Sequence, residues 1–500
     1  MARSLVRLER SGATPSAPDA VRSRSAPLES ILAVLSLAWC AFRLARGLGP
    51  DPFYNSDCAV PILLMQGLAD GPFTLFYPRQ DRYGMWPFLA ARWLHLGTPE
   101  AFHLFSVVAF CSAAVPLWRV LGSPALAVIA LMAPVALNRL VEWNTFQAGQ
   151  PYLWQLVTLC WAWWGCRGAL LGSTTGRRVA AAALLFLAGT LSVWTNPVSL
   201  VALLGALALE TLHARARPVR VAGPVVALGL AALAEAQIRR WYNAYCHRVY
   251  GESFVTGLKL DRGHLLGNVG AVAAVAWREG VVIPVLLGLG ALSLPGWTRT
   301  RRFDQAVLLW MAACTLPALV LVKHFRINDL SNRYFSFAAF WAVAAAACGV
   351  LTVLSGLAGR RGWAVRAVAL AALVLGFPSS PPDPLAVQRA EAARLVGSEP
   401  RVLLGGYWEV YVPASLAAPG ALIPLPREED FNRFPSLQAE LRPGRPALVD
   451  CTIDGAGGTL RQYGGVLRRT ADSPLVAGGR SWCPYAVEQP SRPFGAQRSP

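Results

Sequence analysis

The chain has 500 residues, of which 54% are hydrophobic and 15% charged, and its formal net charge is +18. Its mean hydropathy is +0.41. Long apolar stretches recur along the sequence, which indicates a polytopic membrane protein and excludes an ordinary soluble one. The arginines lie in short clusters between apolar segments, so the positive charge is typical of membrane topology and does not indicate a nucleic-acid partner.

The N-terminal part of the chain is predicted to be a leader followed by membrane spans. Residues 1–27 are polar and rich in Ser, Ala and Pro, which is typical of a disordered cytoplasmic leader and not of a cleaved signal peptide. Residues 28–378 contain about eleven apolar segments near the length that a bilayer requires. Their predicted ranges are 31–50, 103–120, 124–140, 151–168, 179–195, 197–212, 221–238, 275–296, 304–322, 335–355 and 363–378.

Arginine clusters between the predicted spans indicate the orientation. They share one side of the membrane, and they lie near residues 119, 167–178, 215–220, 299–302 and 360–361. The positive-inside rule therefore predicts a cytoplasmic N-terminus and places residues 51–100 and the tail outside. High Ala, Arg, Gly and Pro usage is typical of proteins from GC-rich bacterial genomes. In a bacterium the protein would lie in the inner membrane, and the tail would lie in the periplasm.

The tail, residues 379–500, is predicted to form a small extracytoplasmic α/β domain. A proline-rich linker opens it, a helix is expected over 384–396, and short strands are expected over 402–404, 447–449 and 465–468. Both Cys451 and Cys483 fall in this tail. An oxidising compartment would permit a disulfide between them, and the sequence leaves this pairing and two separate thiols equally open.

The first outside loop contains the polar residues that point to chemistry. Asp57 follows the first span and precedes a short apolar run, 59–68, which we expect to form an interfacial helix. A second short helix is expected over 85–96, and the polar sequence Arg79-Gln80-Asp81-Arg82-Tyr83-Gly84 separates the two. Charged groups are costly beside a bilayer, so this loop is a candidate functional site.

A later outside loop, residues 323–334, predicts an anion site. It contains the potential cations Lys323, His324, Arg326 and Arg333, followed by Tyr334. Arginine forks match phosphate oxygens, so the loop predicts recognition of a phosphate, with Arg333 as the favoured residue. Binding to bulk anionic headgroups is the alternative, and for Tyr334 a place in the aromatic belt of the interface.

These features together resemble a known family. Asn55-Ser56-Asp57 lies just outside the first span, Gln80-Asp81-Arg82-Tyr83-Gly84 leads into an aromatic run ending in Leu96-Gly97, and Arg333-Tyr334 stands at the mouth of a late span. This pattern resembles GT-C type integral-membrane glycosyltransferases, including protein O-mannosyltransferase and lipid A aminoarabinose transferase relatives. The resemblance covers most of residues 28–378 and implies transfer of a sugar from a polyprenyl-phosphate donor to an acceptor of the cell envelope.

The resemblance also implies roles for individual residues. Asp57 matches the loop carboxylate that serves as the base or positions the acceptor. The family often has an Asp-Glu pair there, whereas Cys58 follows Asp57 here, so Asp81 is the candidate second carboxylate. Arg82 and Tyr83 are candidates for substrate binding, as is the 323–334 loop. No clear metal-ligand set is present, and a divalent metal stays open as a cofactor.

Simpler roles exist for these residues. Asp57 would suit the N-cap of a helix that begins near Ala59. Asp81 and Arg82 would suit a surface ion pair. Glu142, in the second outside loop, is a candidate for acceptor or metal binding or a solvated acid beside an interfacial Trp.

Two functions other than catalysis remain open at this point. One is a transporter or flippase of a lipid-linked glycan, and the other is a GT-C-like scaffold without activity. A transporter is expected to show charged residues at mid-membrane in two matching halves, and no such repeat is seen.

Overall fold

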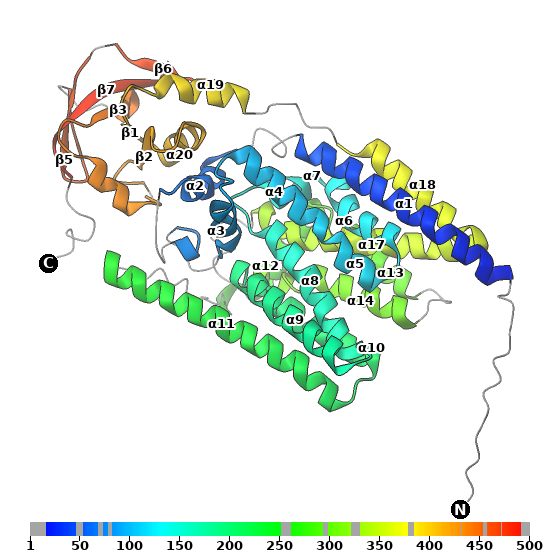
Figure 1. The fold of residues 1–500 in the computed structure, drawn as a ribbon. Helices are drawn as coiled ribbons and strands as arrows, with labels where there is room; N and C mark the ends of the chain where they lie inside the picture. The colour runs from blue at the N-terminus through cyan, green and yellow to red at the C-terminus, as the bar shows by residue number, and fades with distance from the viewer. Residues whose placement is uncertain are drawn as a thin grey trace, which may run out of the picture.

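The computed structural model describes residues 17–46, 54–68, 74–78, 83–251, 262–293, 299–321, 331–378, 385–430, 432–453, 458–471 and 473–491. In these residues, six helices are long and apolar enough to cross a membrane, or eight if each bent helix pair forms one span. The chain is a multi-pass helical membrane protein with a small C-terminal α/β domain (Figure 1).

The described residues of the membrane part mostly form helices. In chain order they are α1 (Ala17–Ala45), α2 (Ser56–Met65), α3 (Trp86–Trp93), α4 (Pro99–Ser112), α5 (Ala114–Leu121), α6 (Pro124–Leu137), α7 (Arg139–Phe146), α8 (Tyr152–Leu171), α9 (Thr175–Thr195), α10 (Val198–Ala214), α11 (Pro218–Tyr250), α12 (Leu265–Arg278), α13 (Val282–Ser293), α14 (Arg299–Ala313), α15 (Leu316–Leu321), α17 (Ser336–Leu357) and α18 (Gly362–Gly376). Short 3₁₀ turns precede α12, α17 and α18, namely η2 (Arg262–His264), η3 (Asn332–Phe335) and η4 (Gly359–Arg361).

Polar caps in the sequence explain where several of these helices begin. The side chains of Thr98, Ser123, Asn138 and Thr174 each accept a hydrogen bond from a backbone N–H in the first turn of the helix that follows. Gly122 ends α5 in the left-handed region at φ 65°, where a residue without a Cβ pays no steric cost. The boundaries of these helices therefore follow from local sequence chemistry.

Each predicted span falls on one or more helices, but the number of spans is not confirmed, because several helices are short or bent. The span predicted over 275–296 is not one straight helix. Helices α12 and α13 meet there at an angle of 87°, and Gly280 between them has φ 71°. An apolar run thus predicts burial in the membrane without predicting that the helix is straight.

The prediction of an interfacial helix over 59–68 is also wrong. Nine of the ten residues of α2 are buried, and the exception is Asp57. The helix lies inside the protein because α3 and a helix of the C-terminal domain pack against it.

The C-terminal domain is built around one mixed sheet. Its helices are α19 (Ala386–Leu395) and α20 (Tyr407–Leu416), and its strands are β1 (Arg401–Gly405), β2 (Leu422–Pro426), β3 (Pro446–Asp450), β4 (Thr459–Gln462), β5 (Gly465–Arg469), β6 (Leu475–Ala477) and β7 (Arg480–Gln489). The strand order is β2-β1-β3-β7-β5-β4, with β6 paired to β7. Strand β1 is parallel to β2 and β3, and the other pairs are antiparallel. The α/β class, the expected helix and the three expected strands are confirmed.

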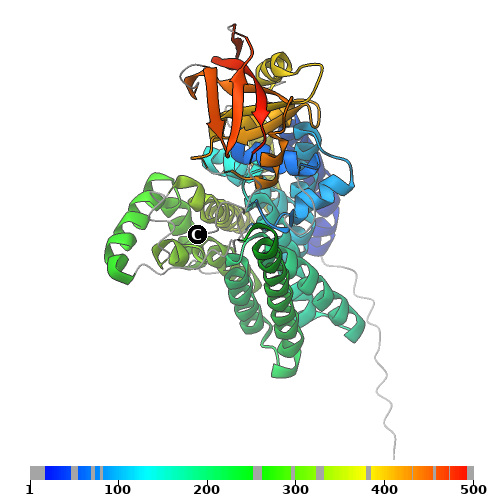
Figure 2. The same ribbon diagram turned by 90° about the vertical axis from the view of Figure 1, so that its left-hand side faces the viewer.

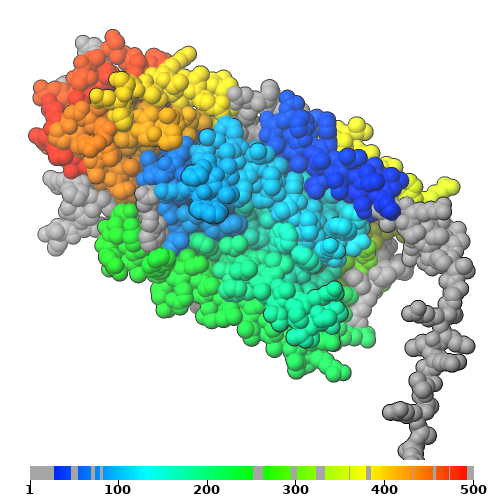
Figure 3. All heavy atoms as spheres, viewed as in Figure 1, coloured from blue at the N-terminus to red at the C-terminus, as the bar shows by residue number. Residues whose placement is uncertain are grey.

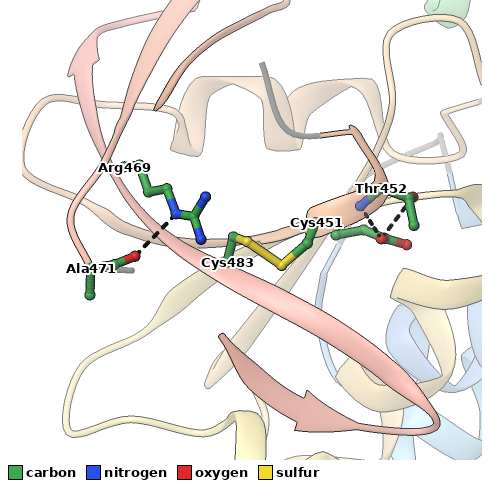
Figure 4. The surroundings of a disulfide bond; sticks show 6 residues. Cys451, Thr452, Arg469, Ala471 and Cys483 are labelled. Carbon is green, nitrogen blue, oxygen red and sulfur yellow. Dashed lines mark hydrogen bonds between the residues drawn. A yellow bond between two sulfur atoms is a disulfide. The ribbon is translucent and has the colours of Figure 1, made fainter. Parts of the chain in front are cut away.

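A disulfide joins two neighbouring strands of this domain. Cys451 follows β3, Cys483 lies in β7, and their Cα atoms are 5.3 Å apart (Figure 4). The bond connects segments that the antiparallel pairing of β3 with β7 already brings together, since Val449 lies opposite Cys483. Of the two possibilities that the sequence left open, the structure has the disulfide.

The C-terminal domain lies at one end of the membrane part and borders directly on α2 (Figures 1, 2 and 3). Helix α20 packs along α2. Ser56 Oγ donates to the Tyr407 carbonyl at 2.9 Å, and Gln66 Nε2 donates to the Ser415 carbonyl at 3.0 Å. Both ends of α2 are therefore tied to α20, which places the first residues of α20 beside Asp57.

Candidate functional site

The start of α2 leaves the Asp57 side chain available. Asn55 is the N-cap, and its side chain accepts a hydrogen bond from the Cys58 N–H at 3.2 Å. Asp57 lies in the first turn, where a carboxylate is favoured by the helix dipole but is not needed as the cap. The alternative that Asp57 itself caps this helix is therefore wrong.

One oxygen of the Asp57 carboxylate is held by two phenols. Tyr407 Oη donates to Oδ1 at 2.9 Å, and Tyr77 Oη lies 3.3 Å from the same atom. The pKa of Tyr407 is raised to about 12, chiefly by burial; the charge of Arg433 acts to lower this pKa and that of Asp57 acts to raise it. The Tyr407 phenol therefore keeps its proton at neutral pH and remains a hydrogen-bond donor to Asp57.

The other oxygen faces a guanidinium group. Arg333 Nη1 lies 3.8 Å from Asp57 Oδ2, and the side chains are 37% and 21% exposed. Arg333 also stacks on the Tyr334 ring, with the guanidinium carbon 5.2 Å from the ring centroid, and its Nη2 donates to Tyr334 Oη at 3.3 Å. Its Nε is buried without a hydrogen-bond partner. A partly exposed guanidinium group therefore lies beside a partly exposed carboxylate.

A second guanidinium group reaches the site from the C-terminal domain. Arg433 Nε donates to Tyr407 Oη at 3.1 Å, and its Nη1 donates to the Pro78 carbonyl at 3.1 Å. Its Nη2 lies 4.0 Å from Asp57 Oδ1. Burial acts to lower the pKa of Arg433, but Tyr77, Tyr407 and Asp57 outweigh it and raise that pKa above its usual value. The group stays charged beside Asp57.

A close backbone contact fixes Asp57 from the side of the membrane part. A Cβ placed on Gly149 would lie 2.5 Å from the Asp57 carbonyl oxygen, so only glycine fits this turn. Tyr83 Oη donates to the carbonyls of Ala148 and Gln150 at 3.1 and 2.9 Å and thereby holds the turn in place. Tyr83, which was expected to bind substrate, is buried, and its ring stacks on that of Tyr77 with the two ring centroids 5.8 Å apart.

The other candidate residues are placed as follows. Arg333 and Tyr334 lie at the site, whereas Glu142 is buried in α7. In the described parts of the chain, no hydrogen bond or ion pair joins Glu142 to Asp57 or Arg333. The remaining candidates lie outside the described residues, and they are Asp81, Arg82, Lys323, His324 and Arg326.

The residues around Asp57 do not fit a divalent cation. Among the residues that the structure describes, no three His, Cys, Asp or Glu side chains gather in one place. In the described residues, the neighbours of Asp57 include phenols that donate hydrogen bonds and two guanidinium groups, and positive charge disfavours a metal cation. No step proposed below passes through a metal.

One cavity in the described residues lies apart from Asp57. It has a volume of about 690 Å³ and is found near the C-terminal end of α2, between α3, α4 and the helices of the C-terminal domain. The residues that line it include Gln66, Arg92, His95 and Arg389. Asp57 is not among them. This cavity is therefore separate from the groups around Asp57.

Three important side chains were not found from the sequence: Tyr77, Tyr407 and Arg433. Tyr407 and Arg433 lie more than 300 residues from Asp57 in the chain, and Arg433 is one of 46 basic residues without a distinguishing motif. The only signal was the position of Tyr407 directly after a strand and two glycines, at the carboxyl end of β1.

Comparisons with known proteins return structures alone. No protein-family profile matches the chain. No curated protein sequence matches it either. The structural similarities are to ArnT from Cupriavidus metallidurans and to the oligosaccharyltransferase of Archaeoglobus fulgidus.

The apo form of ArnT shares 12% identity over 91% of this chain and 97% of its own length, at a TM-score of 0.49. ArnT bound to undecaprenyl phosphate gives the same identity and coverage at a TM-score of 0.47. The oligosaccharyltransferase complex with Zn and sulfate shares 13% identity over 79% of this chain, at a TM-score of 0.42, and this chain spans 62% of its length. Similarities at TM-scores below 0.5 assign neither a residue nor a reaction to this chain. In structure, the chain is similar to GT-C glycosyltransferases, the group that its first loop resembles in sequence.

Proposed function

We propose that this protein is a membrane glycosyltransferase that moves a sugar from a polyprenyl-phosphate donor to an acceptor outside the cytoplasm. Asp57 is the general base, and Arg333 binds the donor phosphate. The observation that carries the proposal is the pairing of a partly exposed carboxylate with a partly exposed guanidinium group, whose Nη1 lies 3.8 Å from Asp57 Oδ2.

The proposed step follows from these two charges. The acceptor hydroxyl attacks the anomeric carbon of the sugar while Asp57 Oδ2 takes its proton. The bond from the anomeric carbon to the phosphate oxygen breaks, and its electron pair leaves with the polyprenyl phosphate. Arg333 stabilises the negative charge that develops on this leaving group, because a guanidinium group matches phosphate oxygens in shape and charge. Direct displacement of this kind inverts the configuration of the anomeric carbon.

Two features support an extracytoplasmic location for the site. The disulfide between Cys451 and Cys483 is typical of an oxidising compartment, and it lies in the domain that contacts Asp57. The arginine clusters of the predicted cytoplasmic loops lie on the other side of the membrane in the predicted topology. The proposal accordingly places the tail in the periplasm and the N-terminus in the cytoplasm of a bacterial inner membrane.

The test is a transfer assay on the full-length protein in nanodiscs, with radiolabelled polyprenyl-phosphate sugars and extracted envelope acceptors. We expect Asp57→Asn to lower the rate roughly 10²- to 10⁴-fold, because general-base catalysis is lost. Binding of undecaprenyl phosphate is measured in parallel and should be retained. Glu100→Gln is the matched control, since Glu100 is a carboxylate in an ion pair with Arg389, away from Asp57.

Each other outcome contradicts the proposal in a specific way. Full activity of Asp57→Asn would remove Asp57 as the base. Binding of the lipid phosphate without sugar transfer by the wild type, for every donor tested, would favour a transporter or a scaffold. Movement of labelled lipid-linked glycan across the bilayer of proteoliposomes would then separate these two.

A further inference from the structure

The two oxygens of the Asp57 carboxylate have different surroundings. Oδ1 accepts a hydrogen bond from Tyr407 at 2.9 Å and lies 3.3 Å from Tyr77 Oη and 4.0 Å from Arg433 Nη2. In the described residues, Oδ2 forms an ion pair with Arg333, whose Nη1 is 3.8 Å away. Among the described residues, the hydrogen bonds to this carboxylate from other side chains are therefore on Oδ1, which favours Oδ2 as the oxygen that takes a proton from a substrate.

We infer that Arg433 is a positioning residue that makes the C-terminal domain part of the catalytic centre. It holds the Asp57 carboxylate, through Tyr407 and Tyr77, with Oδ1 occupied and Oδ2 turned to the acceptor. The inference rests on the proposed function, because it assigns a role in the reaction of which Asp57 is the base.

The contacts of Arg433 distinguish it from a substrate ligand. Its side chain is 12% exposed, and its Nε and Nη1 are both engaged in hydrogen bonds within the protein. The guanidinium carbon also lies 4.8 Å from the ring centroid of Tyr77 and 5.6 Å from that of Tyr407. Arg433 thus lies between the two phenols that contact Asp57, whereas Arg333 is more exposed, at 37%, and is open to a substrate.

The backbone on both sides of this arrangement is also held. The Arg433 N–H donates to Tyr411 Oη at 2.9 Å, and Tyr411 is fully buried. The Tyr407 N–H donates to Asp430 Oδ2 at 3.1 Å at the start of α20. Arg433 and Tyr407 therefore move with the C-terminal domain as one unit.

The Pro78 carbonyl, which accepts from Arg433 Nη1, belongs to the first loop of the membrane part. Arg433 accordingly bridges the two parts of the protein at the residue that does the chemistry. A shift of the C-terminal domain would change the direction of the Asp57 carboxylate, and a displacement of about 1 Å at a catalytic group is enough to lower a rate about 100-fold.

The experiment compares Arg433→Met, Arg433→Lys and Tyr407→Phe in the full-length protein. We expect Arg433→Met to lower kcat roughly 10- to 100-fold, while the KM for the lipid donor changes less than about 2-fold. Arg433→Lys should recover part of kcat, because it keeps a positive charge near Oδ1. Tyr407→Phe should also lower kcat, by less than Arg433→Met.

The matched control is Arg445→Met. Arg445 belongs to the same domain, its side chain is also 12% exposed, and it pairs with Glu440 at 2.7 Å without touching the site. It should leave kcat unchanged. Unfolding temperature and retention of the Cys451–Cys483 disulfide are measured for every variant, so that a loss of folding is not read as a loss of positioning.

A second readout does not depend on transfer. Asp57 is labelled with a carbodiimide and an amine, and the modification is quantified by mass spectrometry. Arg433→Met should increase the labelling rate several-fold over the wild type and over Arg445→Met. Unchanged labelling with unchanged kcat would overturn the inference, as would a rise in donor KM at constant kcat, which would make Arg433 a substrate ligand. Absence of transfer by the wild type would instead contradict the proposed function, and the labelling would still test the position of Asp57.

Discussion

Two clusters of arginines and carboxylates in this protein differ in how deeply they are buried and in how close their charges lie. In the membrane part, Arg167 of α8 contacts Glu210 of α10 at 2.7 Å and Asp304 of α14 at 2.5 Å, with side-chain exposures of 10%, 1% and 5%. Arg167 Nη1 also donates to the Val120 carbonyl of α5 at 2.6 Å. At the Asp57 site, by contrast, the ion-pair distances are 3.8 and 4.0 Å and Arg333 is partly exposed.

The difference separates a structural brace from a site that can react. The donors of Arg167 are directed at groups on three other helices, so the cluster fixes the packing of α5, α8, α10 and α14. Its charges cannot reach a substrate without breaking these contacts. The Asp57 site keeps one carboxylate oxygen and one guanidinium donor without strong partners, which costs stability but allows binding and proton transfer.

The largest expected effect is a loss of unfolding free energy on substitution of Arg167, which would test whether the buried cluster braces the helices. Arg167→Met should lower the free energy of unfolding by about 3–5 kcal/mol, because it leaves two buried carboxylates without their cation. Unfolding in mixed micelles with increasing denaturing detergent would measure this. Arg333→Met, at the open site, should lower that free energy by no more than about 1 kcal/mol, as expected for a partly exposed ion pair.

The comparison would be broken by the reverse pattern. If Arg167→Met unfolded like the wild type, the closed cluster would not brace the helices. If the folded fraction of Arg167→Met lost transfer activity with normal stability, the cluster would take part in function. Activity is therefore expressed per folded molecule, using the protein that remains monodisperse in size-exclusion chromatography.

A smaller effect is expected at the turn that supports Asp57. Gly149→Ala places a methyl group within 2.5 Å of the Asp57 carbonyl oxygen, and one of the two segments must move. Overpacking of this kind costs about 1–3 kcal/mol. We expect transfer to fall roughly 10- to 100-fold, because Asp57 is displaced from its productive position.

Gly176→Ala is the matched control, because a Cβ at that position has no heavy atom within 4 Å. It should behave like the wild type in the transfer assay. Wild-type activity of Gly149→Ala would mean that the contact between Gly149 and the Asp57 backbone does not position Asp57.

The smallest effect is expected from the titration of Tyr407. The folded protein holds the Tyr407 proton up to a pKa of about 12, above the ordinary value of about 10 for tyrosine. A group whose pKa is raised by folding stabilises the folded state fully below its unfolded pKa, and this contribution is lost as the pH rises through the folded pKa. Between about pH 10 and 12, the unfolding free energy of the wild type should therefore fall more steeply than that of Tyr407→Phe.

Alkaline unfolding curves of the two proteins in nanodiscs measure this difference. Other buried tyrosines titrate at high pH in both proteins and cancel when the curves are subtracted. Equal slopes over this window would mean that Tyr407 is not held as a buried phenol beside Asp57.

Local chemistry explains what could be predicted from the sequence. Apolar runs predicted the positions of the membrane helices, because burying apolar side chains in lipid requires length and composition that are visible in one segment. Asp57 was found because a carboxylate just past a span is costly without a function. The tail was recognised as an α/β domain from its alternating short strands and helix.

The rest depended on contacts between distant segments. The bend between α12 and α13 and the burial of α2 under α20 do not follow from hydropathy, which does not say what packs against a helix. In the sequence, nothing distinguishes Arg433 and Tyr407 from other residues of the tail. Only the contacts between the C-terminal domain and the first loop show that they lie beside Asp57.

The sequence by itself therefore determined the class of protein, the apolar segments and the candidate carboxylate Asp57. The tertiary structure alone decided that α20 packs against α2 and that Tyr407 and Arg433 lie beside one of the Asp57 oxygens. The physical reason is that hydropathy and capping act over a few residues, whereas the surroundings of a charge are set by whichever segments fold against it.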